Sequence, residues 1–209
     1  MRSMVRLISV FAVVLLPFAA NGASAQVRTF KVDPSGGSHI QFVSDATLEK
    51  ITGVTSKASG DITVDPNAPA QGKATVRVEV ASIRTGIELR DDHLKSENWL
   101  DAKKCPNAEF VITSISGVDK LKANEAVDVD VKGKFTIHCV TQDLTTKAKV
   151  RWIPASAETK ANKVMGDTLR VQATFVIMLE DHKVSIPSIV SLKVSPKIQV
   201  NVDLRATAQ

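Results

Sequence analysis

Apolar residues alternate with polar ones along most of this chain, and this period of two restricts its fold more than any other feature. In the segment 169–179 the six odd-numbered residues are all apolar, and apolar residues likewise share one parity in 74–80, 144–152 and 192–204. Successive side chains of a β-strand point to opposite faces, so the pattern predicts strands with one apolar and one wet face. Such strands are typical of antiparallel sheets, and a parallel α/β fold is disfavoured.

About eight strands are expected from this pattern. The candidate strands are 28–32, 38–44, 51–64, 72–83, 109–116, 127–140, 144–152 and 167–180, while 193–205 adds a ninth or closes the sheet. Long antiparallel strands with one apolar face either stack as a sandwich or close into a barrel, and closure alone removes the sheet edges. Alternation does not decide between these two architectures.

One segment interrupts the strand pattern. Between residues 88 and 100 the apolar residues are sparse and do not alternate, and Asp91 and Asp92 stand where a first helical turn favours negative charge. Pro106 ends any helical segment because its ring disfavours the α conformation for the preceding residue. The sequence therefore predicts one short helix near residues 88–100.

The first 25 residues have the pattern of a cleaved signal peptide. Arg2 and Arg6 precede an apolar stretch at 7–20, and Ala23-Ser24-Ala25 forms a cleavage site. The apolar stretch is shorter than the ~20 residues that a spanning helix needs. We expect a signal peptide at 1–25 and one exported domain at 26–209, periplasmic or secreted, with no stable membrane span after cleavage.

Charge and motif content disfavour several classes of function. The chain has 27 basic and 22 acidic residues, with its lysines spread along the strands, so a nucleic-acid partner is not expected. The histidines at 39, 93, 138 and 182 have no metal-ligand spacing, and no G-x-S-x-G motif or glycine-rich phosphate loop is present. We therefore expect no metal, no cofactor and no catalytic residues, although sequence leaves a dispersed Ser-His-Asp arrangement open.

Several short motifs follow one another along the expected elements. They are Phe30 to Pro34, Ser38 to Phe42, Gly60 to Ile62, Ser82 to Gly86, Arg90 to Ser96, Pro106 to Phe110, and Lys132 to Thr141. In this order they resemble the signature of the YceI family of lipocalin-like, polyisoprenoid-binding proteins. The resemblance covers nearly all of the chain after the N-terminal segment. It implies an all-β, antiparallel, lipocalin-like barrel of about eight strands with one short inserted helix and a long central cavity.

The presumed inward side chains are mostly small and aliphatic. A barrel of about eight strands is either filled by its side chains or holds one ligand, and the whole chain has seven Phe, two Trp and no Tyr. Composition leaves a packed core and a cavity equally open, and the resemblance favours the cavity. The candidate lining residues are Val76, Val78, Val80, Ile137, Val150, Val171, Ala173, Phe175, Val200 and Val202.

The densest polar cluster of the chain surrounds the expected helix. One interpretation is structural, with caps and ion pairs that fix the helix to the barrel rim. The other is that a cation here meets the polar head of an isoprenoid, a diphosphate or a quinone oxygen, because forked guanidinium donors suit such oxygens. The head-group candidates are Arg84, Arg90, His93 and Lys95.

The two cysteines, Cys105 and Cys139, are candidates for a disulfide. A hairpin centred near Lys122 would bring them opposite each other, and oxidising compartments form such bonds. Both cysteines also depart from the family pattern, which has glycine at position 139. Two free buried thiols are the alternative.

The function that these features favour is a non-enzymatic, exported lipid-binding protein. Its ligand would be a long-chain polyisoprenoid, of the isoprenoid quinone or polyprenyl phosphate type, or a similar amphiphile. One alternative is a secreted stress-response or interaction domain with a closed, packed core, and another is a hydrolase or isomerase built on the same barrel. The sequence leaves the oligomeric state open, including a homodimer.

Overall fold

A single antiparallel sheet dominates the computed structural model, which describes residues 26–35 and 37–208. The expected signal peptide at 1–25 lies outside the described residues. The strands are β1 (Arg28–Val32), β2 (His39–Asp45), β3 (Lys50–Thr55), β4 (Ala58–Val64), β5 (Lys73–Glu79), β6 (Asn107–Ser116), β7 (Ala126–Ile137), β8 (Val140–Ile153), β9 (Thr168–Met178) and β10 (Lys197–Ala208).

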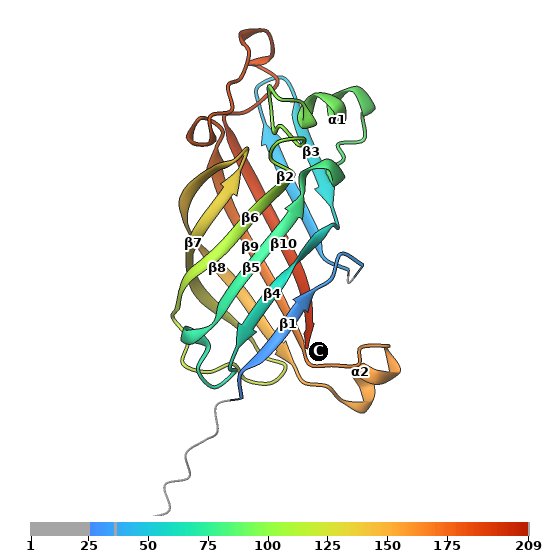
Figure 1. The fold of residues 1–209 in the computed structure, drawn as a ribbon, viewed down its shortest axis with the longest axis vertical. Helices are drawn as coiled ribbons and strands as arrows, with labels where there is room; N and C mark the ends of the chain where they lie inside the picture. Colours follow the sequence, from blue (N-terminus) through green and yellow to red (C-terminus); the bar gives the residue numbers. More distant parts are fainter. Residues whose placement is uncertain (1–25, 36, 209) are drawn as a thin grey trace, which may run out of the picture.

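The sheet closes on itself into a barrel (Figure 1). One edge of β10 pairs with β9, while its other edge pairs with β2 and, further along, with β1. β1 and β2 thus act as one interrupted strand, and β3 and β4, which pair with β2 and β1, act as another. Counted in this way the ring has eight strands, which confirms the predicted barrel and excludes the sandwich.

Some strand boundaries differ from the prediction. The segment 51–64 is not continuous, since β3 ends at Thr55 and β4 begins at Ala58. β8 begins at Val140, because β7 and β8 are joined by His138 and Cys139 alone, both with left-handed backbone (φ 52° and 57°). Two left-handed residues make the tight turn that matches the twist of a hairpin. The polar residues 141–143 therefore belong to the strand and not to a loop.

The predicted short helix is present as α1 (Glu88–Lys95), and it lies at one end of the barrel beside β2 and β3 (Figure 1). It ends before residue 100 because Ser96 is extended, with its backbone N–H and its hydroxyl both donating to the carbonyl of His93. Within the described part of the chain, no helix is long and apolar enough to cross a membrane.

A second short helix, α2 (Ala157–Ala161), was not predicted. Ser156 caps it by accepting from the backbone N–H of Thr159, whose hydroxyl accepts from the backbone N–H of Ser156. The remaining short elements are single 3-10 turns: η1 (Pro69–Gln71), η2 (Val80–Ser82), η3 (Glu180–His182) and η4 (Ser188–Val190).

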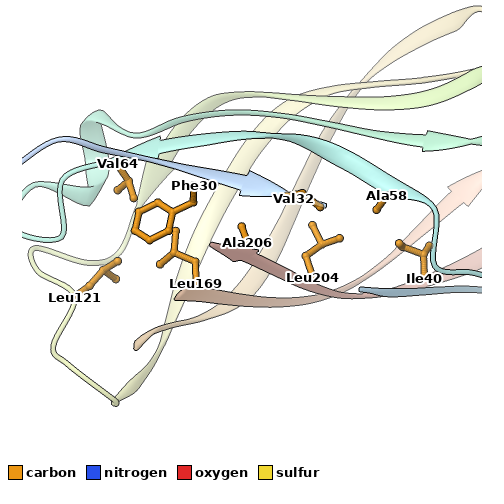
Figure 2. Packing of buried hydrophobic residues seen from close by; sticks show 9 residues of the cluster. All are labelled: Phe30, Val32, Ile40, Ala58, Val64, Leu121, Leu169, Leu204 and Ala206. Carbon is orange, nitrogen blue, oxygen red and sulfur yellow. The ribbon is translucent and has the colours of Figure 1, made fainter. Parts of the chain in front are cut away.

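The end of the barrel opposite α1 is closed by a hydrophobic cluster (Figure 2). Phe30, Val64, Leu121 and Leu169 lie together there and are all buried. Leu121 belongs to the β6–β7 connection, and its backbone N–H donates to the carbonyl of Pro66. This hydrogen bond holds the connection at this end of the barrel. The cluster continues along β1 and β10 toward the middle of the barrel. This end therefore forms a floor.

Candidate ligand-binding cavity

The interior of the barrel is hollow. It holds a cavity of about 520 Å³, with walls of aliphatic and aromatic side chains contributed from around the whole ring. Pockets that bind small molecules measure roughly 300–1,000 Å³ and are mostly apolar. The cavity has the size and chemistry to take an apolar ligand, and the packed core considered from sequence is not what the structure has.

Nine of the ten residues expected inside lie in the cavity wall. Val80 does not, and this expectation was wrong. β5 ends at Glu79 and the chain enters η2, so the strand parity that pointed Val80 inward no longer applies. Val80 instead packs against Ile83 and Leu100 in a separate buried cluster. The nine wall residues are Val76, Val78, Ile137, Val150, Val171, Ala173, Phe175, Val200 and Val202.

Aromatic rings that sequence reasoning did not select also line the cavity, among them Phe42 and Phe110. Each ring packs over a glycine of a neighbouring strand. A Cβ at Gly53 would collide with the ring of Phe42, and a Cβ at Gly133 would collide with that of Phe110. Glycine inside a strand often marks such a close approach, so these glycines were the available signal. Because the rings lie against the wall, the centre of the barrel stays open.

The cavity opens at the end where α1 lies. Val54, Ile87 and Leu89 belong to its wall and yet have 37%, 52% and 67% of their surface exposed. Two further exposed leucines, Leu48 and Leu192, stand at the same end, where the backbone N–H of Leu48 donates to the carbonyl of Leu192. We call this end the mouth, and we define it by these five residues. Its rim is apolar.

A short chain of polar contacts crosses the mouth. Nη1 of Arg90 lies 2.6 Å from Oε1 of Glu49, and Nε of Arg90 donates to the hydroxyl of Thr85 at 3.0 Å. Nη2 of Arg90 also donates to the carbonyl of Thr85, at 3.3 Å. All three residues belong to the cavity wall. The guanidinium is therefore held at the mouth by groups from two separate segments.

Asp91 supports this arrangement through two hydrogen bonds to Thr85. It is only 5% exposed, and its Oδ1 accepts hydrogen bonds from the backbone N–H and the hydroxyl of Thr85, at 2.7 and 2.6 Å. Burial acts to raise the pKa of Asp91, but the two Thr85 hydrogen bonds, together with Lys95 and Arg84, act against it, and the pKa is lowered. The carboxylate thus stays charged at neutral pH and fixes Thr85, which in turn positions Arg90.

The four head-group candidates have different positions. Arg90 and His93 line the cavity, whereas Arg84 and Lys95 do not. Nη1 of Arg84 donates to the carbonyls of Ala81 and Ile83, so its guanidinium is engaged with the backbone outside the cavity. Sequence reasoning did not select Glu49, the partner of Arg90. Over the described residues, no group of three or more His, Cys, Asp or Glu side chains is placed to hold a metal ion.

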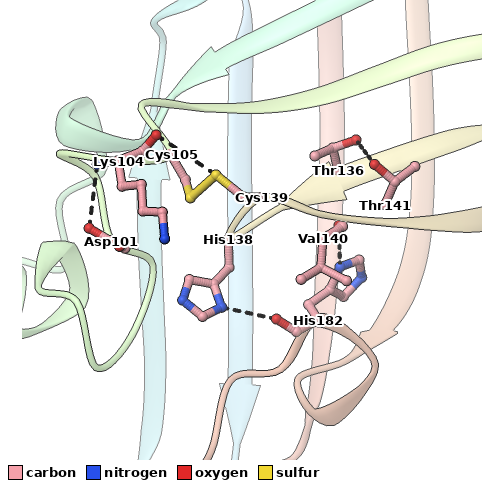
Figure 3. The surroundings of a disulfide bond; sticks show 9 residues. All are labelled: Asp101, Lys104, Cys105, Thr136, His138, Cys139, Val140, Thr141 and His182. Carbon is pink, nitrogen blue, oxygen red and sulfur yellow. Dashed lines mark hydrogen bonds between the residues drawn. A yellow bond between two sulfur atoms is a disulfide. The ribbon is translucent and has the colours of Figure 1, made fainter.

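The predicted disulfide is present near the mouth (Figure 3). Cys105, just before β6, is joined to Cys139 in the β7–β8 turn, with 5.4 Å between their Cα atoms. The same turn is attached to η3, because Nδ1 of His138 donates to the carbonyl of His182 at 3.0 Å. Nδ1 of His182 in turn donates to the carbonyl of Val140. The disulfide and these hydrogen bonds connect the turn to two other segments.

The sequence of this chain is similar to a known family and to curated proteins. The sequence model of the YceI-like domain matches residues 30–206. A UPF0312 protein of Pseudomonas fluorescens is 37% identical over 98 residues, which are 47% of this chain and 49% of that protein. Protein YceI of Escherichia coli is 28% identical over 132 residues, 62% of this chain and 65% of that protein. These matches thus span about half to two thirds of the length of the curated relatives.

Solved structures with the same fold include BcnA of Burkholderia cenocepacia. It is 26% identical, with a TM-score of 0.66 over 84% of this chain and 99% of that one. A polyisoprenoid binding domain from Saccharophagus degradans has a TM-score of 0.67 at 18% identity, over 88% of this chain and 99% of its own. At that identity the likeness concerns the fold alone.

Proposed function

The chain belongs to the family of YceI-like domains, and from this premise we propose that it is a non-enzymatic carrier that holds one long isoprenoid chain in its barrel. The observation that carries the proposal is the apolar cavity of about 520 Å³, open at the mouth and closed by a floor. The fold itself is shared with a protein described as a polyisoprenoid binding domain.

The shape of the cavity supports one orientation of the ligand. The tail would lie toward the floor, near Leu121 and Leu169, and the polar head would lie at the mouth, near Arg90 and His93. Burial of apolar surface contributes roughly 25 cal/mol per Å² before the costs of association, so the tail supplies most of the affinity. The polar groups at the mouth would orient the head.

We also propose that the protein works outside the cytoplasm, in the periplasm or as a secreted protein. The signal-peptide pattern at 1–25 supports export. The disulfide between Cys105 and Cys139 supports it independently, because such bonds persist in oxidising compartments.

Affinity should increase with the length of the isoprenoid tail and then stop increasing. Each buried CH₂ contributes up to ~0.8 kcal/mol until the cavity is full. Isoprenoid alcohols of increasing length, titrated by calorimetry, give this series. Ala173 faces Ala148 across β8 and β9, and both lie in the wall, so Ala173→Phe should shorten the tail length at which affinity stops rising.

The matched control is Gln172→Phe, which adds the same ring one residue away. Gln172 lies on the outer face, where its Nε2 donates a hydrogen bond to Oδ2 of Asp203. It should leave the length dependence unchanged. Affinity that is independent of tail length in the unmodified protein would contradict the carrier function. Chemical conversion of any of these alcohols during the titration would instead favour the hydrolase or isomerase alternative.

A further inference from the structure

We propose that Glu49 determines which head groups the mouth accepts. By pairing with Arg90, it makes the carrier select amphiphiles with an uncharged, hydrogen-bonding head over those with a phosphate or carboxylate head. The inference rests on the proposed carrier function and adds the class of head group. It concerns Arg90, the one arginine among residues 26–35 and 37–208 that lines the cavity, where its guanidinium is fixed at the mouth.

The charge of Arg90 is already matched by a neighbouring carboxylate. Its Nη1 lies 2.6 Å from Oε1 of Glu49, and the two side chains keep only 25% and 39% of their surface exposed. A head-group anion that approached the guanidinium would also approach the carboxylate. Repulsion by the carboxylate would offset most of the attraction by the guanidinium, because both act over a few ångströms in the same partly buried surroundings.

The side chain of Arg90 is also held in place by Thr85. Its Nε and Nη2 donate to the hydroxyl and the carbonyl of Thr85. Thr85 is itself fixed by two hydrogen bonds to the buried carboxylate of Asp91. A forked, two-oxygen contact through Nε and Nη2 would require Arg90 to give up its hydrogen bonds to Thr85. A phosphate is therefore left with the terminal N–H groups, where it would face the carboxylate of Glu49.

Arg90 and Glu49 still have donor and acceptor groups for an uncharged head. A guanidinium has more N–H groups than the three engaged here, so terminal N–H groups remain for a carbonyl or hydroxyl oxygen. Among the described residues, no hydrogen bond engages Oε2 of Glu49, so this oxygen can accept from a hydroxyl. An uncharged head therefore gains hydrogen bonds without facing a like charge.

Other charged groups at this end do not replace Arg90. Lys193 also lines the cavity, but its side chain is exposed, so water and salt screen it. His93 is likewise exposed, and Arg84 is engaged with backbone carbonyls outside the cavity. Glu49 is thus the group whose removal should change the preference most.

The test compares geranylgeraniol with geranylgeranyl phosphate, two probes with the same tail, by calorimetry in low salt. The unmodified protein should bind the alcohol at least as tightly as the phosphate. Glu49→Gln keeps the shape of the side chain and removes its charge, so affinity for the phosphate should rise by about ten- to a hundredfold while affinity for the alcohol changes by less than about threefold. Glu97→Gln, an exposed acidic residue at the same end that does not line the cavity, should change neither.

The gain should depend on Arg90. In the double variant Glu49→Gln with Arg90→Gln, the increase in phosphate affinity should disappear. A gain that persists would place the anion elsewhere, for example at Lys193, and would overturn the proposal. Tighter binding of the phosphate by the unmodified protein would overturn it as well, and this comparison needs no variant. If the unmodified protein binds neither probe, the carrier function itself fails, which is a different result.

Discussion

Val131→Glu should cost the barrel several kcal/mol of unfolding free energy, whereas Lys132→Glu should change it by about 0.5 kcal/mol or less. Val131 is 5% exposed and lies in the cavity wall, while the next residue of β7, Lys132, is exposed on the outer face. The new carboxylate at position 131 would lose its hydration without gaining a partner. Urea denaturation of both variants at neutral pH measures the difference.

The loss of unfolding free energy in Val131→Glu should also depend on pH. Burial raises the pKa of a carboxyl group in the folded state above its unfolded value of about 4.3. The penalty is therefore small below that unfolded value, where the group is neutral in both states, and it grows as the pH rises toward the folded value. Equal stability of the two variants at neutral pH, or a loss that is independent of pH, would contradict the assignment of inner and outer faces.

Reduction of the disulfide should lower the stability of the protein by about 3–4 kcal/mol. The bond joins residues 34 apart in the sequence, and a cross-link of this span restricts the unfolded chain. For a domain of this size each kcal/mol corresponds to roughly 2–4 °C in Tm. Thermal unfolding with and without reductant measures the effect. Titratable thiols in unreduced protein from an oxidising compartment would contradict the bond.

A pair of variants separates the cross-link from the turn that carries it. Cys139 has a left-handed backbone (φ 57°), a conformation that costs a residue with a Cβ about 1–2 kcal/mol and costs glycine little. The double variant Cys105→Ala with Cys139→Gly should therefore be about 1 kcal/mol more stable than Cys105→Ala with Cys139→Ala. Both should be insensitive to reductant. This conformation also gives a physical reason for the glycine in the family pattern at position 139.

Features that depend on neighbouring residues could be predicted from the sequence. Alternation located the strands, and a hairpin centred near Lys122 was enough to place Cys105 opposite Cys139. In the structure Glu109 pairs with Thr136, one residue from that register. Closure of the ring could not be derived from alternation. It depends on the pairing of Phe30 with Ala208, at opposite ends of the chain, and only the resemblance indicated it.

The candidate site was only partly predictable, because it also depends on contacts between residues that are far apart in the sequence. The segment around Arg90 stood out by its density of charge, but its partner Glu49 is 41 residues away and lies in no recognisable pattern. Val80 was misplaced because a 3-10 turn replaces the end of a strand. Whether the interior is hollow also depends on long-range geometry, since the position of Phe42 against Gly53 becomes visible only when two strands are paired.

The central claim, that the barrel carries a lipid in its cavity, is tested most directly by native mass spectrometry of the protein exported by its own host and purified without detergent. We expect a mass above that of the processed chain, with an excess that organic extraction removes. The extracted protein should regain an equivalent excess when it is incubated with geranylgeraniol. Protein that has the mass of the chain alone, both as purified and after this incubation, would contradict the claim.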